Sequence, residues 1–125
     1  MRELTYAAAV AEALREEMER DEKVFRIGED IGGVREADDL FAEFRKHRVW
    51  QTPISESGFT GLAVGAAARG LRPVVEIMYC DFVSVAMDQI CNQAAKIALM
   101  SGGSVKVPLV IKTPAGSGTR EGGHH

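Results

Sequence analysis

The segment that most constrains the fold is an uncharged run that begins directly after an acidic residue. Glu56 follows Thr52-Pro53-Ile54-Ser55, and the next twelve residues, Ser57 to Ala68, carry no charged side chain. Three glycines lie within this run: Gly58, Gly61 and Gly65. Each glycine inside a helix costs about 1 kcal/mol relative to alanine, so close packing against another backbone or a flat ligand is the natural compensation. We therefore expect a tightly packed helix with one carboxylate at its start.

Two interpretations of Glu56 are open from its spacing alone. Burial opposes the charge of the carboxyl group, whereas the positive end of the helix dipole favours that charge. A carboxyl group under both influences can hold a proton or share it with a ligand nitrogen. The alternative is that Glu56 only stabilises the first turn of its helix, while the Ser55 hydroxyl caps that helix.

Composition limits the class of protein. The chain has 125 residues, 46% hydrophobic and 26% charged, as expected for one globular domain. The net charge of −3 favours neither nucleic acid nor an anionic membrane surface as a partner. Cys80 and Cys91 fit neither a disulfide framework nor a metal site, and we expect both to be small buried residues in a reducing compartment. The polar start and the lack of a long apolar run predict a cytoplasmic or organelle-matrix protein without a membrane segment.

Helices and strands alternate along the chain, which predicts an α/β fold with a parallel sheet covered by helices on both faces. A helix is expected from Thr5 to Arg20, and another from Pro53 to about Arg69 that ends at Gly70. A short helix is expected from Asp38 or Asp39, with Leu40, Phe41 and Phe44 on one side. The expected strands are Val24–Gly28, Val49–Thr52, Pro73–Met78 and Val107–Lys112.

A long helix is expected after the third strand, capped by Asp81 and ending near Met100. Between Phe82 and Met100 only Asp88 and Lys96 are charged. One apolar stripe at helical spacing comprises Val83, Met87, Ile90, Ala94 and Ile97. Further apolar residues lie outside this stripe, so the helix is expected to be buried on more than one side. The second buried side meets either another chain or a further part of the same chain.

Six blocks in order now identify a resemblance. They are Thr52-Pro-Ile-Ser-Glu-Ser-Gly-Phe59, Gly61-Leu-Ala-Val-Gly-Ala-Ala-Ala68, Gly70-Leu-Arg-Pro-Val-Val-Glu-Ile77, Asp88-Gln-Ile-Cys-Asn-Gln-Ala-Ala-Lys96, Met100-Ser-Gly-Gly103 and Val107-Pro-Leu-Val110. Together with Gly28-Glu29-Asp30, they resemble the beta subunit of thiamine-diphosphate-dependent 2-oxo acid dehydrogenases. The resemblance covers the whole chain but about the first third of a typical subunit. It implies that residues 1–125 are the transketolase-like pyrimidine-binding domain, incomplete at the C-terminus and without the subunit's C-terminal domain.

The resemblance also implies roles for individual residues. Glu56 matches the glutamate that contacts the aminopyrimidine ring nitrogen of thiamine diphosphate and so promotes loss of the thiazolium proton. Phe82 matches an aromatic residue that stacks on the pyrimidine, although a first-turn core residue is the simpler interpretation from the residues. Ile54 matches an apolar residue of the same pocket. His125 falls on the family's active-site histidine and His124 on its glutamine; the alternative is that these two histidines belong to no site.

Partners and alternatives follow from the same resemblance. Relatives act on pyruvate, branched-chain 2-oxo acids or acetoin, transfer the acyl group to a lipoyl group, and work as heterotetramers. The implied partners are an alpha subunit that supplies the Mg²⁺ and diphosphate site, a second beta subunit and a lipoyl acyltransferase core. The chain itself shows no metal-binding motif, and we expect it to be inactive alone. One alternative is a truncated domain that catalyses nothing. Another is a nucleotide-binding domain, which would use Gly116-Ser-Gly118; the sequence argues against it, because no helix follows these glycines within the chain.

Overall fold

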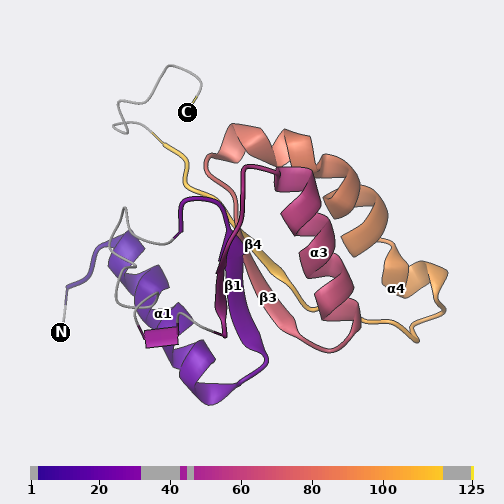
Figure 1. Cartoon of the computed structure of the whole chain (residues 1–125), viewed down its shortest axis with the longest axis horizontal. Helices are drawn as coiled ribbons and strands as arrows, with labels where there is room; N and C mark the ends of the chain where they lie inside the picture. Colours follow the sequence, from indigo (N-terminus) through magenta and orange to yellow (C-terminus); the bar gives the residue numbers. More distant parts are fainter. Residues whose placement is uncertain (1–2, 32–42, 45–46, 117–124) are drawn as a thin grey trace.

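Four parallel strands form one sheet with helices on both faces (Figure 1). The computed structural model describes residues 3–31, 43–44, 47–116 and 125. The strands are β1 (Val24–Gly28), β2 (Val49–Gln51), β3 (Arg72–Glu76) and β4 (Val110–Lys112). Their order across the sheet is β2-β1-β3-β4, and each neighbouring pair is parallel. The predicted α/β fold with a parallel sheet is confirmed.

The predicted strand boundaries agree with the structure to different degrees. The bounds of β1 are as predicted, and β2 ends one residue early. β3 begins one residue earlier and ends two residues earlier than expected. The amide of Ile77 still donates to the carbonyl of Lys112, and the chain then turns towards the next helical segment. β4 is restricted to three residues, since its register pairs only Val110–Lys112 with β3. A propensity pattern marks an extended segment but not where its partner strand ends.

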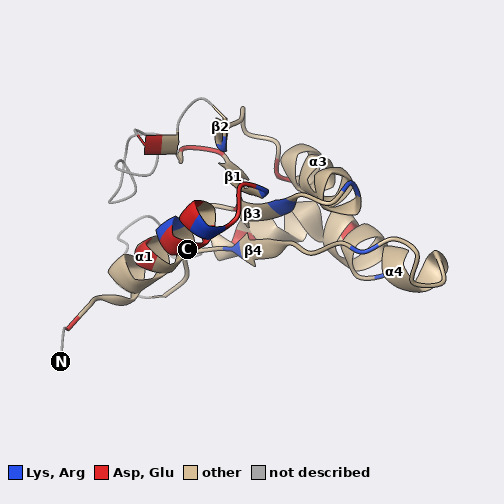
Figure 2. Cartoon of the chain, turned by 90° about the horizontal axis from the view of Figure 1, so that it is seen from below, with Lys and Arg blue, Asp and Glu red and all other residues tan. Residues whose placement is uncertain are grey.

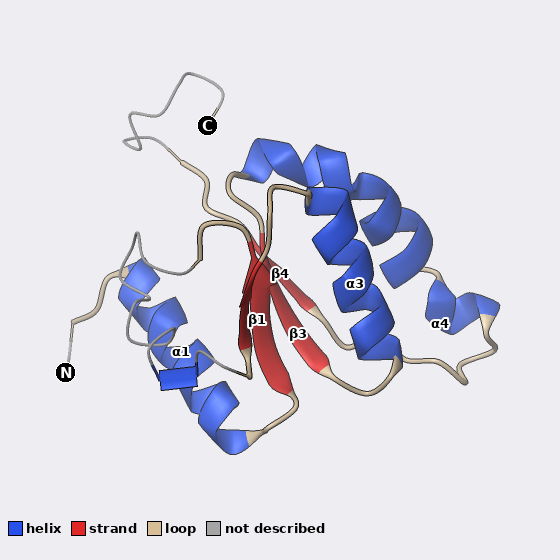
Figure 3. Ribbon diagram, in the orientation of Figure 1, coloured by secondary structure: helices blue, strands red, loops and turns tan. Residues whose placement is uncertain are grey.

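Helix α1 (Tyr6–Arg20) covers one face of the sheet (Figure 3). Its N-cap is Thr5, whose hydroxyl accepts from the amide of Ala8 at 3.1 Å. Leu14 and Met18 are buried against the sheet in a cluster that includes Val24 and Val49. Charged residues, coloured red and blue in Figure 2, occupy several positions in the second half of this helix. The predicted amphipathic helix is therefore confirmed to within one residue.

Helix α3 (Glu56–Ala68) covers the opposite face. Phe59 and Ala63 pack on Phe25, Ile27 and Val75 in the larger core cluster. The helix ends at the predicted place, where Gly70 has a positive φ of 96° and donates to the carbonyl of Ala67. The predicted side-chain cap is wrong, because the Ser55 hydroxyl donates to the carbonyl of Pro53 at 3.0 Å and makes no capping bond.

The segment after β3 is helical but is not the single regular helix that we expected. It consists of η1 (Cys80–Ala86), a 3₁₀ helix, η2 (Gln89–Ala94), a π-helix, and α4 (Ile97–Met100). Both η1 and η2 lie beside α3 (Figure 1). The amide of Ala95 donates to the carbonyl of Ile90, five residues back. An apolar stripe specifies which side of a helical segment faces the core, but not the spacing of its hydrogen bonds. The expectation of one uninterrupted helix was therefore wrong.

The two cysteines and the predicted short helix differ from the expectations in different ways. Cys80 is only partly buried and Cys91 is exposed in η2, so the prediction that both are buried was wrong. Their spacing gave no information on the side of the helical segment that each would occupy. The predicted short helix from Asp38 or Asp39 lies almost wholly outside the described residues. Within the described ranges, no helix is both long and apolar enough to cross a membrane.

Candidate functional site

The candidate site lies where the parallel strands end, at the upper edge of the sheet in Figure 3. The chain leaves β1 towards β2 and leaves β3 towards β4, so the connections from two adjacent strands run in opposite directions. Open parallel sheets bind ligands outside the carboxyl ends of strands at such a switch point. β1 and β3 approach closely at Gly28. A Cβ added to this residue would lie only 2.3 Å from the carbonyl oxygen of Glu76. Glycine is therefore required immediately before Glu29.

Glu29 and Glu56 form a buried carboxyl pair at this edge. Glu29 follows β1 and is 5% exposed, whereas Glu56 is the first residue of α3 and is 8% exposed. Loss of solvation raises the pKa of Glu29 to about 7, and the nearby carboxyl groups of Glu56 and Asp30 act in the same direction. Nearby like charges disfavour the ionised form of a carboxyl group, so Glu29 keeps its proton to a higher pH than an ordinary glutamate does.

Polar atoms without partners accompany the pair. Among the described residues, three buried side-chain oxygens lack a hydrogen-bond partner: Glu29 Oε2, Thr52 Oγ1 and Thr60 Oγ1. Thr52 follows β2 and its amide donates to the carbonyl of Gly28. Thr60 lies one helical turn after Glu56, hence on the same face of α3. An unpaired buried oxygen costs about 1–3 kcal/mol, so a ligand that supplies hydrogen-bonding groups would fit this part of the fold.

The other predicted residues lie in two different settings. Ile54 is 78% exposed in the segment before α3, so it lines no closed pocket in this chain. Phe82 lies in η1, partly buried against the larger core cluster. Its side chain thus has the core contacts of the simpler interpretation, and its ring centroid is also 5.4 Å from that of His125. His124 lies outside the described residues.

His125 is held beside the segment that leaves β3. Its Nδ1 lies 2.8 Å from Oδ1 of Asp81, and its ring centroid is 4.5 Å from that of Tyr79. The structure therefore brings His125 together with Phe82, and brings Glu56 together with Glu29. Both α3, which begins at Glu56, and η1, which contains Phe82, contribute residues to the larger core cluster.

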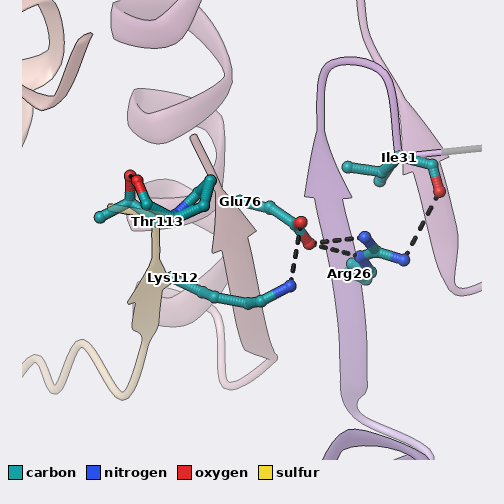
Figure 4. Close-up of polar contacts among 6 residues, drawn as sticks. Arg26, Ile31, Glu76, Lys112 and Thr113 are labelled. Carbon is teal, nitrogen blue, oxygen red and sulfur yellow. Dashed lines mark hydrogen bonds and ion pairs between the residues drawn. The ribbon is translucent and has the colours of Figure 1, made fainter. Parts of the chain in front are cut away.

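A buried ion network joins three adjacent strands, β1, β3 and β4 (Figure 4). Glu76 of β3 accepts from Arg26 Nε at 2.9 Å and Nη2 at 2.6 Å, and from Lys112 Nζ at 2.9 Å. Arg26 also donates to the carbonyl of Ile31 at 3.5 Å. Arg26 is 3% exposed, so its charge depends on this partner. The network connects β4 and β3 to β1 and to the segment that contains Glu29.

No group of three or more potential metal ligands occurs in the part of the chain that the structure describes. Sequence reasoning also missed the role of Glu29, which appeared only within Gly28-Glu29-Asp30. The available indication was an acidic residue directly after an apolar strand that ends in glycine. The sequence did not show that this acid would meet Glu56, because that contact requires β1 to lie between β2 and β3.

Comparison with known proteins identifies one protein family and several relatives of this chain. The family described as "Transketolase, pyrimidine binding domain" matches residues 2–125. "Pyruvate dehydrogenase E1 component subunit beta" of Rickettsia conorii is 46% identical over 127 residues, which cover 98% of this chain and 39% of that protein. The mitochondrial protein of the same description from Bos taurus is 42% identical, over 98% of this chain and 35% of that protein. "Acetoin:2,6-dichlorophenolindophenol oxidoreductase subunit beta" of Cupriavidus necator is 42% identical, over 99% of this chain and 40% of that protein. The chain thus spans about two-fifths of the length of these relatives.

Proposed function

This chain belongs to the transketolase pyrimidine-binding domain family, and from that premise we propose that it forms the pyrimidine half of a thiamine diphosphate site in the beta subunit of a 2-oxo acid dehydrogenase. The observation that carries the proposal is the buried pair of Glu56 and Glu29, with a pKa of about 7 on Glu29. A carboxyl group with a pKa near neutral pH can give a proton to a neighbouring group, or take one from it, without a large cost. The unpaired Glu29 Oε2 and Thr60 Oγ1 support a ligand with hydrogen-bonding groups.

Each residue has a defined part in this proposal. Glu56 contacts the pyrimidine ring nitrogen, and Glu29 supplies a second carboxyl group beside it, with a pKa of about 7. Phe82 and Ile54 contribute the apolar walls, and His125 exchanges protons with substrate or product. When bound, thiamine diphosphate supplies the carbon nucleophile and the electron sink for decarboxylation.

The remaining parts of the enzyme are assigned to partners. The described residues include no metal-ligand cluster, and the diphosphate with its Mg²⁺ needs oxygen ligands, which we assign to an alpha subunit. A second beta subunit and a lipoyl acyltransferase core complete the proposed complex. Relatives with mitochondrial descriptions and bacterial relatives support a cytoplasmic or organelle-matrix location.

Calorimetry with thiamine diphosphate tests the proposal. We expect weak or no binding to the chain alone and strong, Mg²⁺-dependent binding once the beta subunit containing this segment is assembled with an alpha subunit. Phe82→Ala should weaken the assembled binding by about 1 kcal/mol through lost aromatic contact. Tight Mg²⁺-dependent binding to the isolated chain would show that the phosphate site has been misassigned.

A second candidate function is acetoin cleavage by the same site. The acetoin-enzyme relative matches almost as well as the pyruvate dehydrogenase relatives, at 42% against 46% identity. Both reactions use the proposed pyrimidine contact, so the residues described above do not separate them. Parallel assays of the assembled enzyme with pyruvate, a branched-chain 2-oxo acid and acetoin decide between them. An assembled complex that binds the cofactor but turns over none of these would favour the non-catalytic alternative.

A further inference from the structure

Asp81 and His125 come from positions 44 residues apart and are joined by a hydrogen bond between their side chains. Nδ1 of His125 lies 2.8 Å from Oδ1 of Asp81, with the two side chains 11% and 27% exposed. The sequence suggested only a helix-capping role for Asp81. The structure instead places Tyr79 at the N-cap of η1, without a side-chain capping bond. The observed contact of the Asp81 carboxylate is therefore with an imidazole ring.

The histidine ring is restrained by more than this one contact. Its centroid lies 4.5 Å from the Tyr79 ring and 5.4 Å from the Phe82 ring. Tyr79 is itself buried. Tyr79, Asp81 and Phe82 all belong to the short segment between β3 and the first turn of η1. This segment thus supplies a carboxylate for one ring edge and aromatic surface for the imidazole.

Backbone hydrogen bonds fix the segment that carries these side chains. The amide of Cys80 donates to the carbonyl of Pro114 at 3.1 Å, which ties the segment to the chain that follows β4. The amide of Phe82 donates to the carbonyl of Tyr79, and the Ser84 hydroxyl donates to the carbonyl of Asp81 at 2.8 Å. The Asp81 carboxylate is consequently presented from a backbone with few alternative conformations.

A carboxylate beside one imidazole nitrogen determines the tautomer of the ring. A proton on Nδ1 is stabilised by the carboxylate, and the neutral ring then has Nε2 as its proton acceptor. The same arrangement of a base oriented by a third group recurs in catalytic sites of unrelated folds. We infer that Asp81 is a positioning residue, which holds His125 as the Nδ1–H tautomer so that Nε2 exchanges protons during the reaction. The inference rests on the proposed function in taking His125 as a proton-exchanging group.

A double-mutant cycle in the assembled full-length enzyme tests this inference. Asp81→Ala should lower kcat by about 10–100-fold, the scale known for removal of a group that orients a metal-bound histidine, with little change in KM. In the His125→Ala background the same Asp81 substitution should change kcat by less than about twofold, because its effect passes through the ring. Asp81→Glu should recover part of the rate, whereas Asp81→Asn, with an amide that can donate to Nδ1, should not. Asp88→Asn, on the exposed side of the same helical region, is the matched control and should retain the wild-type rate.

Several outcomes would overturn the inference. One is an Asp81→Ala effect that is equally large with and without His125, which would indicate a structural role. Another is an unchanged kcat in either Asp81→Ala or Asp81→Asn; the amide variant serves if the alanine variant fails to assemble. Failure of the proposed function is recognised separately, because Glu56→Gln would then leave the reaction intact whatever Asp81 does.

Discussion

Glu29 and Glu56 are neighbouring carboxyl groups, and burial together with the Glu56 carboxyl group raises the pKa of Glu29 to about 7. They come from the end of β1 and the start of α3, which the parallel sheet brings to one edge. Both are buried. The pair is therefore the part of the fold where stability and the proposed chemistry both depend on protonation.

The stability of the chain should fall as the pH rises from about 4.5 to about 7. The pKa of Glu29 is raised from its ordinary value of 4.5 to about 7, chiefly by loss of solvation. Within this window the folded chain binds more protons than the unfolded chain, so the free energy of unfolding decreases with pH. Urea unfolding at a series of pH values measures the slope. Glu29→Gln should reduce this slope, whereas Glu19→Gln on the exposed side of α1 should keep it; equal slopes in all three proteins would contradict the assignment.

Gly28→Ala should destabilise the chain by about 1–3 kcal/mol, the usual cost of forcing atoms into a packed site. The added Cβ would lie 2.3 Å from the Glu76 carbonyl oxygen, so β1 or β3 must move. Gly65→Ala is the matched control, because its added Cβ meets no atom within 4 Å and alanine is favoured over glycine in a helix by up to about 1 kcal/mol. Thermal unfolding should therefore move in opposite directions for the two variants. A Gly28 variant as stable as the wild type would show that β1 and β3 do not approach as described.

Arg26→Met should cost about 3–5 kcal/mol, because it leaves the buried carboxylate of Glu76 with Lys112 as its remaining cationic partner in the network. Arg20→Ala provides the comparison. Arg20 is also paired with a glutamate, Glu17, but both side chains are exposed, and such pairs contribute at most about 1 kcal/mol. Chemical denaturation of both variants measures the difference. Similar losses would show that the Arg26 network is not protected from solvent.

The isolated chain should self-associate or bind a dye that detects apolar surface. Large apolar side chains are exposed along α3 and the segment after β3: Leu62, Val85, Met87, Leu99 and Met100. Apolar patches that are larger than a few hundred Å² are typical of interfaces, and exposed apolar side chains on neighbouring helical segments favour such a patch. Sedimentation at increasing concentration measures association, and Leu99→Glu with Met100→Glu should reduce it. A clean monomer at high concentration with no dye binding would contradict the expected interface.

The sequence predicted the layers of this fold better than its details. Apolar strands flanked by helical periodicity were sufficient for α1, β1 and the end of α3 at Gly70. The 3₁₀ and π hydrogen-bond spacing of η1 and η2 was not predictable, because apolar side chains at several helical spacings satisfy the same packing. The exposure of Cys91 follows from that geometry and was missed for the same reason.

The sequence predicted some residues of the candidate site and missed others. Glu56 stood out because a lone acid precedes an uncharged, glycine-containing helix, and its burial is confirmed. Glu29 and Asp81 did not stand out, since each acquires its partner only through contacts between distant segments. The roles of Glu56, Phe82, Ile54 and His125 remain predictions. A contact such as that of Asp81 with His125 depends on the strand order, which the sequence pattern leaves open.

Glu56→Gln in the assembled enzyme is the most direct test of the central claim, that Glu56 moves a proton on the pyrimidine ring. Glutamine keeps the size and a hydrogen bond, so folding and subunit assembly should be nearly unchanged, and Glu16→Gln on exposed α1 controls for the loss of one charge. Exchange of the thiazolium proton of bound thiamine diphosphate, followed by NMR, should slow by about 10²–10⁴-fold, the usual contribution of a positioned proton-transfer group. Exchange at the wild-type rate in Glu56→Gln would contradict the catalytic assignment of Glu56.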